Sequence, residues 1–323
     1  MLGAQQSPGD AAPSRAPLPG TAYAAPRTPW GDPDLQGDYT NKYEQGTPFE
    51  RPSEFDGRRL EDVTGDELEE LVEERGVQVI LNAPFSGDPL GGNFGGAPAF
   101  YDQFEARKGS RPWFVVDPSA GKIPALTPEA RQRVAARAKA RAEARRVRGP
   151  SDSWTDHSLY DRCISRGVPG SMMPTNYGNS YTILQAPGVV AIRYEMIHET
   201  RIIPLDTRPR ADARIQQHMG DARGRWEGDV LVVETTNFRD DNVYREADPR
   251  TLRLVERFRR TSAKTVEWSV TVDDPGTWTT PWTFTMPLTM SATERVLEYA
   301  CHEGNRAMEN MLGVARAEER RGR

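Results

Sequence analysis

The stretch LRLVERFRRTSAKTVEWSVTVDD, residues 252–274, is the part of the chain that most directly predicts its fold. Its second half alternates between apolar and polar residues, so every second side chain falls on one face of a β-strand. That apolar face carries Val266, Trp268, Val270 and Val272. The first half alternates in the same way, and the small polar residues around Ser262–Lys264 are typical of a turn. The stretch therefore predicts an antiparallel hairpin with one buried face.

The same two-residue period continues through most of residues 181–302, interrupted by turn signals such as Pro187-Gly188 and Glu227-Gly228-Asp229. About seven or eight short strands within roughly 120 residues indicate an antiparallel barrel or sandwich. No alternation of helices with strands supports a parallel sheet. The predicted class is therefore mainly β.

Composition divides the chain into three regions. Residues 1–58 are rich in Pro, Gly and Asp and show no sustained period, which predicts a disordered or extended N-terminal arm. Residues 59–150 are expected to pack on the barrel as an extension of helices and strands, and residues 151–323 to form the antiparallel β-barrel domain. The arm and two peripheral helices would thus lie outside the barrel.

Within the extension, Thr64-Gly65-Asp66-Glu67 resembles a capping box and predicts a short helix over about 65–75, followed by a strand at 77–81. Thr127 followed by Pro128 predicts the start of a second helix that runs to about residue 148.

Charge and hydrophobicity exclude several classes of protein. The 42 Lys and Arg against 47 Asp and Glu give a net charge of −5, which argues against a nucleic-acid binder. No apolar run is long enough for a transmembrane helix. The first residues lack the apolar core of a signal peptide and resemble the polar stretch that follows a removed signal. These features argue against nucleic-acid and membrane-spanning partners. Because an eight-stranded barrel can hold one small ligand, the expected partner is a small-molecule ligand or substrate, and the oligomeric state is left open.

Polar residues interrupt the apolar faces of three predicted strands. Read as one strand, VVAIRYEMIHE (189–199) places Tyr194 and His198 on an inward face. Glu256 shares a row with Leu254 and Phe258 in the next hairpin, and RVLEYACHE (295–303) carries Glu298 and His302 on one of its faces. These groups would meet at the barrel interior.

Such a cluster suits acid–base chemistry, because burial shifts the pKa of a carboxyl group and a nearby imidazole can share its proton. We therefore predict His198, Glu256 and His302 as catalytic residues, with Tyr194 and Glu298 contacting the substrate. The reaction would be that of a lyase, isomerase or hydrolase acting on a small amphipathic or carboxylated molecule.

Arginines supply candidate anchors for an anionic substrate. Arg162 and Arg166 lie in a long irregular segment, residues 158–179, of the kind that forms the rim of a pocket. Together with Arg201 they could bind a carboxylate in bidentate fashion.

Three alternatives remain at this stage. The polar residues could form a satisfied core network, with Glu256 paired to an inward arginine, in a non-catalytic carrier of small ligands. The chain could also be an interaction protein that uses its arm and arginine-rich helix. No cofactor is required, although two histidines and a carboxylate could hold a divalent metal; neither His198-Glu199 nor His302-Glu303 continues into a zinc-protease motif.

The two cysteines, Cys163 and Cys301, are too far apart in sequence for a CxxC motif. Composition leaves open whether they form a disulfide or remain two buried thiols.

Long motifs along the chain resemble a large family of exported bacterial proteins without an assigned activity. They are RTPWGDPDLQGDYTN (27–41), FERP (49–52), SLYDRCISRGVPG (158–170), YEMIHETRIIPLD (194–206), MGDARGRWEGDVLVVETTNF (219–238), DDPGTWTTPWT (273–283) and LEYACHEGN (297–305). The resemblance implies a periplasmic or secreted protein, favours a Cys163–Cys301 disulfide and, by analogy of strand pattern, implies a lipocalin-like barrel. It supplies no catalytic residues.

Overall fold

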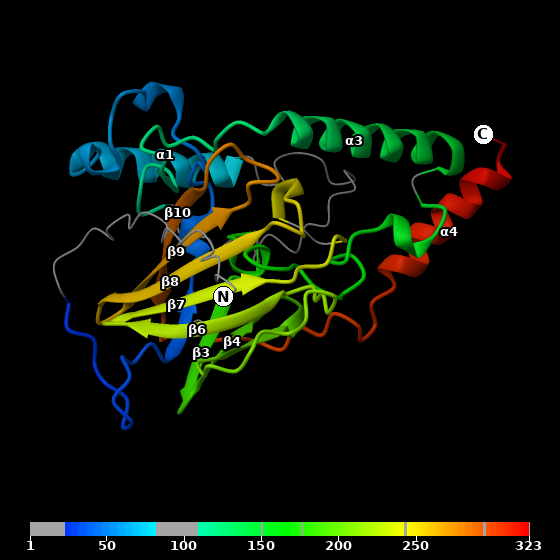
Figure 1. The fold of residues 1–323 in the computed structure, drawn as a ribbon. Helices are drawn as coiled ribbons and strands as arrows, with labels where there is room; N and C mark the ends of the chain where they lie inside the picture. Colours follow the sequence, from blue (N-terminus) through cyan, green and yellow to red (C-terminus); the bar gives the residue numbers. More distant parts are fainter. Residues whose placement is uncertain are drawn as a thin grey trace, which may run out of the picture.

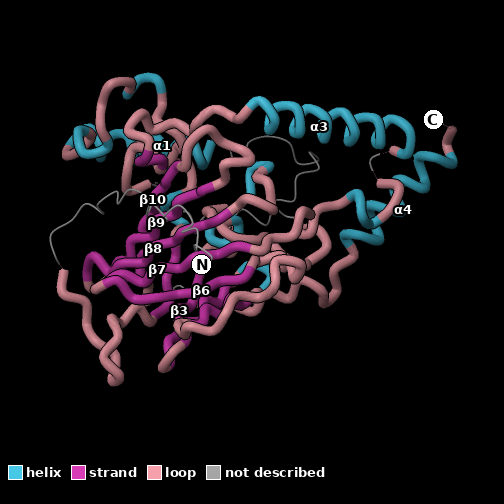
Figure 2. Tube along the Cα trace, viewed as in Figure 1, coloured by secondary structure: helices cyan, strands magenta, loops and turns pink. Residues whose placement is uncertain are grey.

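The computed structural model describes residues 23–81, 109–149, 151–175, 177–241, 244–292 and 295–322. Over these residues the chain is mainly β, as the sequence predicts, and ten strands form a single antiparallel sheet (Figures 1 and 2). The strands are β1 (Gly37–Thr40), β2 (Val115–Asp117), β3 (Ser180–Ala186), β4 (Val189–Tyr194), β5 (Thr200–Pro204), β6 (Asp221–Glu227), β7 (Val230–Thr236), β8 (Arg253–Ser262), β9 (Thr265–Asp273) and β10 (Trp282–Met290). The helices are α1 (Asp66–Leu81), α3 (Pro128–Arg148) and α4 (Ala307–Arg320).

The strand order is β5-β4-β3-β1-β10-β9-β8-β7-β6, and β2 also pairs with β10. The hairpin predicted from residues 252–274 is β8–β9, where Phe258 lies opposite Trp268 and the strands turn after Ser262. The sheet curls until its two end strands, β5 and β6, lie side by side. Gly224 of β6 makes this approach possible, because a Cβ atom there would come within 2.6 Å of Leu205 and 2.9 Å of Ile203.

The N-terminal arm contributes directly to this barrel. Residues 37–40 form β1, which pairs with β3 on one side and β10 on the other, so part of the arm is a central strand that the sequence pattern did not predict. Before it, the side chain of Gln185 accepts a hydrogen bond from the backbone N–H of Leu35 (2.6 Å) and donates one to the carbonyl of Pro33 (3.0 Å). The arm is thus part of the sheet rather than a separate layer.

Large side chains fill the inside of the curled sheet. The largest of those that are almost completely buried are Tyr39, Tyr181, Tyr194, Phe258, Trp268, Trp282 and Phe284. The period-2 pattern of β8, β9 and β10 places their even-numbered residues in this core, as predicted. Burial of such rings is the main driving force for the fold.

Two elements differ from the expectation. Residues 77–81 form the last turn of α1 rather than a strand. Residues 295–303, expected as a strand, run as an irregular segment into α4, which the sequence pattern did not predict. The helix at residues 128–148 is confirmed as α3, with the hydroxyl of Thr127 accepting a hydrogen bond from the N–H of Ala130 (3.1 Å). Figure 1 shows α1 and α3 on one side of the sheet and α4 crossing below the far end of α3.

Candidate functional site

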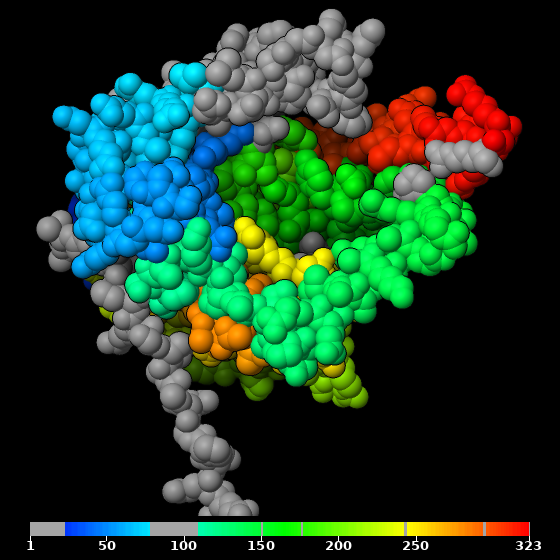
Figure 3. Space-filling model, turned by 90° about the horizontal axis from the view of Figure 1, so that it is seen from above, coloured from blue at the N-terminus to red at the C-terminus, as the bar shows by residue number. Residues whose placement is uncertain are grey.

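A pocket of about 610 Å³ opens at one end of the barrel. It is lined by Ser158, Leu159, Tyr160, Ser165, Arg166, Gly170, Thr175, Tyr177, Met196 and Asp241. All but two of these belong to the segment 158–179, which leads into β3 and which the sequence predicted as a pocket rim. Seen from above in Figure 3, the molecule is hollowed, with this part of the chain (green) at the floor.

Local hydrogen bonds shape the rim segment. The carboxylate of Asp161 accepts bonds from the N–H and hydroxyl of Ser158 (3.1 and 2.7 Å). Cys163 adopts a left-handed conformation with φ 56°, and Ser165 and Arg166, which follow it, line the pocket. At the other end of the segment Gly178, with φ +70°, lies against Met196, where a Cβ atom would approach the Met196 methyl to 2.8 Å.

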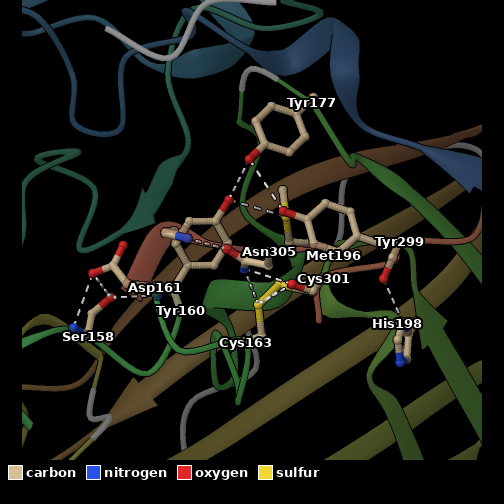
Figure 4. Close-up of a disulfide and its surroundings, with 11 residues drawn as sticks. Ser158, Tyr160, Asp161, Cys163, Tyr177, Met196, His198, Tyr299, Cys301 and Asn305 are labelled. Atoms are coloured by element: carbon tan, nitrogen blue, oxygen red, sulfur yellow. Dashed lines mark hydrogen bonds between the residues drawn. A yellow bond between two sulfur atoms is a disulfide. The ribbon is translucent and has the colours of Figure 1, made fainter. Parts of the chain in front are cut away.

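Three tyrosines from two distant segments meet beside the pocket (Figure 4). The hydroxyls of Tyr160 and Tyr177 are 2.8 Å apart, and those of Tyr177 and Tyr299 are 3.3 Å apart. The rings of Tyr177 and Tyr299 are stacked, with centroids 6.2 Å apart and an interplanar angle of 10°. Partial burial, followed by the hydrogen bond with Tyr177, raises the pKa of both Tyr160 and Tyr299 above the usual tyrosine range. The hydroxyls thus stay protonated and can donate hydrogen bonds.

Arg166 supplies the positive charge of the pocket. Its guanidinium lies over the ring of Tyr160, 5.6 Å from the centroid. Among the described residues no carboxylate forms an ion pair with it, whereas Asp241, also in the lining, is paired with Arg239 (3.1 Å). Arg166 therefore remains available to an anion in the pocket.

Ser165 connects the pocket to a carboxyl group behind its wall. The hydroxyl of Ser165 donates a hydrogen bond to Oε2 of Glu199 at 3.0 Å. Burial raises the pKa of Glu199 above its ordinary value, although the bonds from Ser165 and from the N–H of Arg166 act in the opposite direction. Glu199 is thus a carboxyl group with a raised pKa that lies one hydroxyl away from the pocket.

The turn between β4 and β5 carries Met196 into the pocket lining. Ile197 (φ 61°) and His198 (φ 40°) both lie in the left-handed region, which is costly for a β-branched residue such as isoleucine. The N–H of His198 donates to the carbonyl of Glu195 (2.9 Å), and its Nδ1–H donates to the carbonyl of Tyr299 (2.7 Å). Strained backbone of this kind is often found at functional sites.

The predicted catalytic residues do not come together. β4 ends at Tyr194, so His198 lies in a 3-10 turn with an exposed side chain, and its predicted inward orientation is wrong. Glu256 is completely buried in the barrel core. His302 and Glu298 are exposed on the irregular segment that was expected to be a strand, so neither points into the barrel.

The inward arginine that partners Glu256 is Arg201, one of the predicted substrate anchors. Its Nη2 lies 2.6 Å from Oε2 of Glu256, and the indole N–H of Trp268 donates to Oε1 at 3.2 Å. Tyr194, predicted to contact substrate, is completely buried next to this pair, and burial raises its pKa. These residues form the core network that the sequence left as an alternative.

The remaining predicted anchors separate into two groups. Arg166 lines the pocket as expected, whereas Arg162 lies over the ring of Trp154 (4.4 Å to the centroid) and is not in the lining. Tyr160, Tyr177, Tyr299 and Ser165 are not among the site residues that the sequence pattern predicts. Tyr160, Tyr177 and Ser165 lie in the predicted rim segment. Tyr299 lies two residues before Cys301, so a disulfide between Cys163 and Cys301 would have indicated that Tyr299 is close to this segment.

Cys163 and Cys301 form a disulfide, as the sequence resemblance favoured. In the described part of the chain, no three His, Cys, Asp or Glu side chains gather in a way that would hold a metal ion. Among the same residues, none of the helices is long and apolar enough to cross a membrane.

Fold and site together define a mainly β protein whose curled antiparallel sheet carries a disulfide-linked pocket at one end. No family model and no curated protein matches the chain. Among solved structures, a "secretary abundant heat soluble (SAHS)" protein from Ramazzottius varieornatus is similar, with 11% identity over 42% of this chain and 87% of that one. The TM-score is 0.24.

Proposed function

We propose that this protein binds a small amphipathic anion, such as an organic carboxylate, in the pocket at the end of the barrel. The observation that carries the proposal is the guanidinium of Arg166, which faces the pocket without a carboxylate partner among the described residues. A cation in a partly enclosed pocket attracts an anion more strongly than one in bulk water does. A carboxylate is the ligand group that best matches the planar fork of arginine.

The rest of the lining suits the same ligand. Leu159 and Met196 offer apolar surface, and the rings of Tyr160 and Tyr177 can contact an aromatic or aliphatic body. The tyrosine hydroxyls add hydrogen-bond donors. The volume of about 610 Å³ falls within the range of small-molecule sites.

Binding accounts for the geometry better than catalysis by the predicted trio does. Glu256 already has Arg201 and Trp268 as partners in the core, while His198 and His302 are exposed outside the pocket lining. The function closest to these placements is therefore that of a carrier or sensor of a small ligand.

Acid–base catalysis is a second candidate, and it rests on Glu199 instead. A carboxyl group with a raised pKa that is hydrogen-bonded to a pocket hydroxyl could exchange a proton with a bound molecule through Ser165. A screen of carboxylated substrates for turnover tests this candidate: activity that Glu199→Gln abolishes without loss of ligand affinity would establish it, and binding without turnover across the screen would count against it.

Isothermal titration with naphthalene-2-carboxylate tests the binding proposal, because this probe combines a carboxylate with an apolar body. We expect binding to the wild-type protein, and Arg166→Gln should weaken it by about tenfold or more, since a hydrogen bond to a charged group contributes at least that much. Arg162→Gln is the matched control, as Arg162 lies on the same segment outside the lining.

The neutral analogue naphthalene-2-methanol separates charge from shape. It should bind more weakly than the carboxylate to the wild type and about equally to the wild type and Arg166→Gln. Equal affinity of both probes for both proteins would overturn the proposal. Native mass spectrometry of the purified protein would then identify any ligand that is retained from expression.

A further inference from the structure

We propose that the Cys163–Cys301 disulfide, acting through Tyr299, holds the pocket in its binding shape, and that opening this disulfide with a dithiol lowers ligand affinity. The predicted loss of ligand affinity rests on the proposed function. The predicted loosening of the pocket wall does not, and it can be measured without a ligand.

The disulfide joins the rim segment to a distant part of the chain. Cys163 lies between Tyr160 and Ser165, both of which line the pocket, and its N–H donates to the carbonyl of Tyr160 at 2.9 Å. Its partner Cys301 belongs to the irregular segment 295–306, which we call the C-terminal strap. The disulfide thus fixes the strap to the rim segment close to the three tyrosines (Figure 4).

Tyr299 carries the effect of the disulfide to the pocket. It lies two residues from Cys301, stacks on Tyr177 and shares a hydrogen bond with its hydroxyl. Tyr177 in turn bonds to Tyr160, so the positions of two lining rings depend on a residue outside the lining. Tyr299 is therefore a positioning residue.

Apart from the disulfide and the contacts of Tyr299 with Tyr177, few hydrogen bonds among the described residues attach the strap to the rest of the chain. His198 donates to the carbonyl of Tyr299 (2.7 Å), and the amide of Asn305 donates to the carbonyl of Cys301 (2.7 Å) within the strap and to Sγ of Cys163 (3.2 Å) in the disulfide itself. Leu297 is 65% exposed. Segments with little buried surface open locally at low cost, so the strap should separate from the pocket once the covalent link is gone.

The helix that follows the strap has its own attachment. Arg316 of α4 donates to the carbonyls of Asp152 (2.9 Å) and Ser151 (3.1 Å). Opening the disulfide should therefore loosen the strap between β10 and α4 without releasing α4 or the barrel.

The chemistry is thiol–disulfide exchange with a dithiol as the reductant. A thiolate of the dithiol attacks one cysteine sulfur, the bond between Cys163 and Cys301 breaks, and the released thiolate takes up a proton. The second thiol of the reagent then closes onto the mixed disulfide. Two electrons pass to the protein, which ends with two thiols, and the dithiol ends as a cyclic disulfide.

The loosening of the pocket wall is tested by hydrogen–deuterium exchange of the full chain before and after treatment with dithiothreitol. We expect exchange to rise in peptides that cover residues 295–306 and 158–179 and to stay unchanged in β8 and β9. Unchanged exchange in both peptides after confirmed reduction would overturn the inference whether or not a ligand is known. Circular dichroism shows whether the barrel stays folded.

The loss of affinity is tested by repeating the titration with naphthalene-2-carboxylate on oxidised and reduced protein. Reduction should weaken binding roughly tenfold, because the lining rings must be ordered again on binding. Tyr299→Ala should weaken it to a similar extent with the disulfide intact, and reduction of this variant should add little. Leu297→Ala, an exposed position on the same strap, is the matched control and should leave affinity unchanged.

The two proposals fail in different ways. If oxidised protein binds the probe and Arg166→Gln weakens binding, but reduction and Tyr299→Ala do not, the inference about the disulfide is wrong and the binding proposal stands. If the probe does not bind while exchange in residues 158–179 rises on reduction, the strap holds the pocket and the proposed ligand class is wrong.

Discussion

Arg201 of β5 and Glu256 of β8 form an ion pair inside the barrel, with Nη2 of the arginine 2.6 Å from Oε2 of the carboxylate. The strands are distant in the order of the sheet, so the pair crosses the interior of the curled sheet. Thr235 also accepts a hydrogen bond from the same Nη2 (2.5 Å). Burial lowers the pKa of Arg201, but the interactions with Glu256 and Tyr194 together more than offset this effect, so the guanidinium stays charged.

Removing one member of this pair should destabilise the fold strongly. Glu256→Gln leaves a buried guanidinium without its counter-charge, and we expect the free energy of unfolding to fall by about 3 kcal/mol or more. The double substitution Arg201→Met with Glu256→Leu should recover most of that loss, since it removes both charges. Urea denaturation of the variants measures this, and Arg225→Ala, which removes an exposed ion pair with Glu227, should cost less than about 1 kcal/mol. Equal losses for the single and the double core variants would contradict the ion-pair interpretation.

The buried carboxyl group of Glu44 should lower the free energy of unfolding as pH rises. Burial raises its pKa, although the N–H of Ser110 donates to it at 3.2 Å. A raised folded-state pKa contributes stability below the unfolded pKa, and this contribution is lost as pH rises through the folded pKa. The stability of Glu44→Gln relative to wild type should therefore improve as pH rises from about 4 to 7.

Glu227→Gln is the matched control for this measurement. A hydrogen bond from Arg257 lowers the pKa of Glu227, so the wild-type carboxylate contributes stability above its unfolded pKa and loses it as pH falls. The stability of this variant relative to wild type should thus fall with rising pH, opposite in sign to Glu44→Gln. Denaturation at a series of pH values checks both, and parallel trends would show that Glu44 does not act as described.

Gly224 should be required for the close approach of β5 and β6. Gly224→Ala would place a methyl group against Ile203 and Leu205, and we expect a loss of about 1–3 kcal/mol from overpacking. Gly313→Ala in α4 is the control, because nothing lies within 4 Å of its Cβ position and alanine favours a helix. Thermal unfolding should show a lower midpoint for the first variant and an equal or higher one for the second; a neutral Gly224→Ala would mean that the two strands can separate freely.

The disulfide should contribute to global stability as well as to the pocket. It closes a long loop, with a sequence separation of 138 residues, and the chain-entropy model gives an upper value of about 5 kcal/mol for loops of this size. Cys163→Ser with Cys301→Ser should therefore lower the free energy of unfolding measured in urea by up to that amount. If the denaturation curves of the wild type and the double variant coincide, the disulfide does not restrict the unfolded chain as the entropy model requires, and the prediction is wrong.

The sequence by itself determined the class of the fold and most of the strands. β9 and β10 each have an apolar face, and β8 has one that Glu256 and Arg260 interrupt. A shift of one residue would turn these apolar side chains away from the core, so the pattern specifies both strand and register. α3 was equally predictable, because its N-cap and first-turn proline act locally. The disulfide followed from only two cysteines and a resemblance.

The tertiary structure decided what the polar residues do. Alternation was extended past Tyr194 to His198, but the chain turns there through two left-handed residues, which no local pattern of apolar side chains reveals. β1 was missed because its short segment is stabilised by pairing with β3 and β10 rather than by its own composition. Glu256 was correctly placed among apolar residues, yet its partner Arg201 lies on a distant strand.

The pocket depends on the same kind of long-range contact. Tyr160 and Tyr177 are near in sequence, but Tyr299 reaches them only because the sheet returns the chain to this end of the barrel and the disulfide holds it there. The local sequence determines which face of a strand is apolar, because side chains two residues apart lie on the same face. Which polar groups meet depends on the curl of the whole sheet, and only the three-dimensional structure shows it.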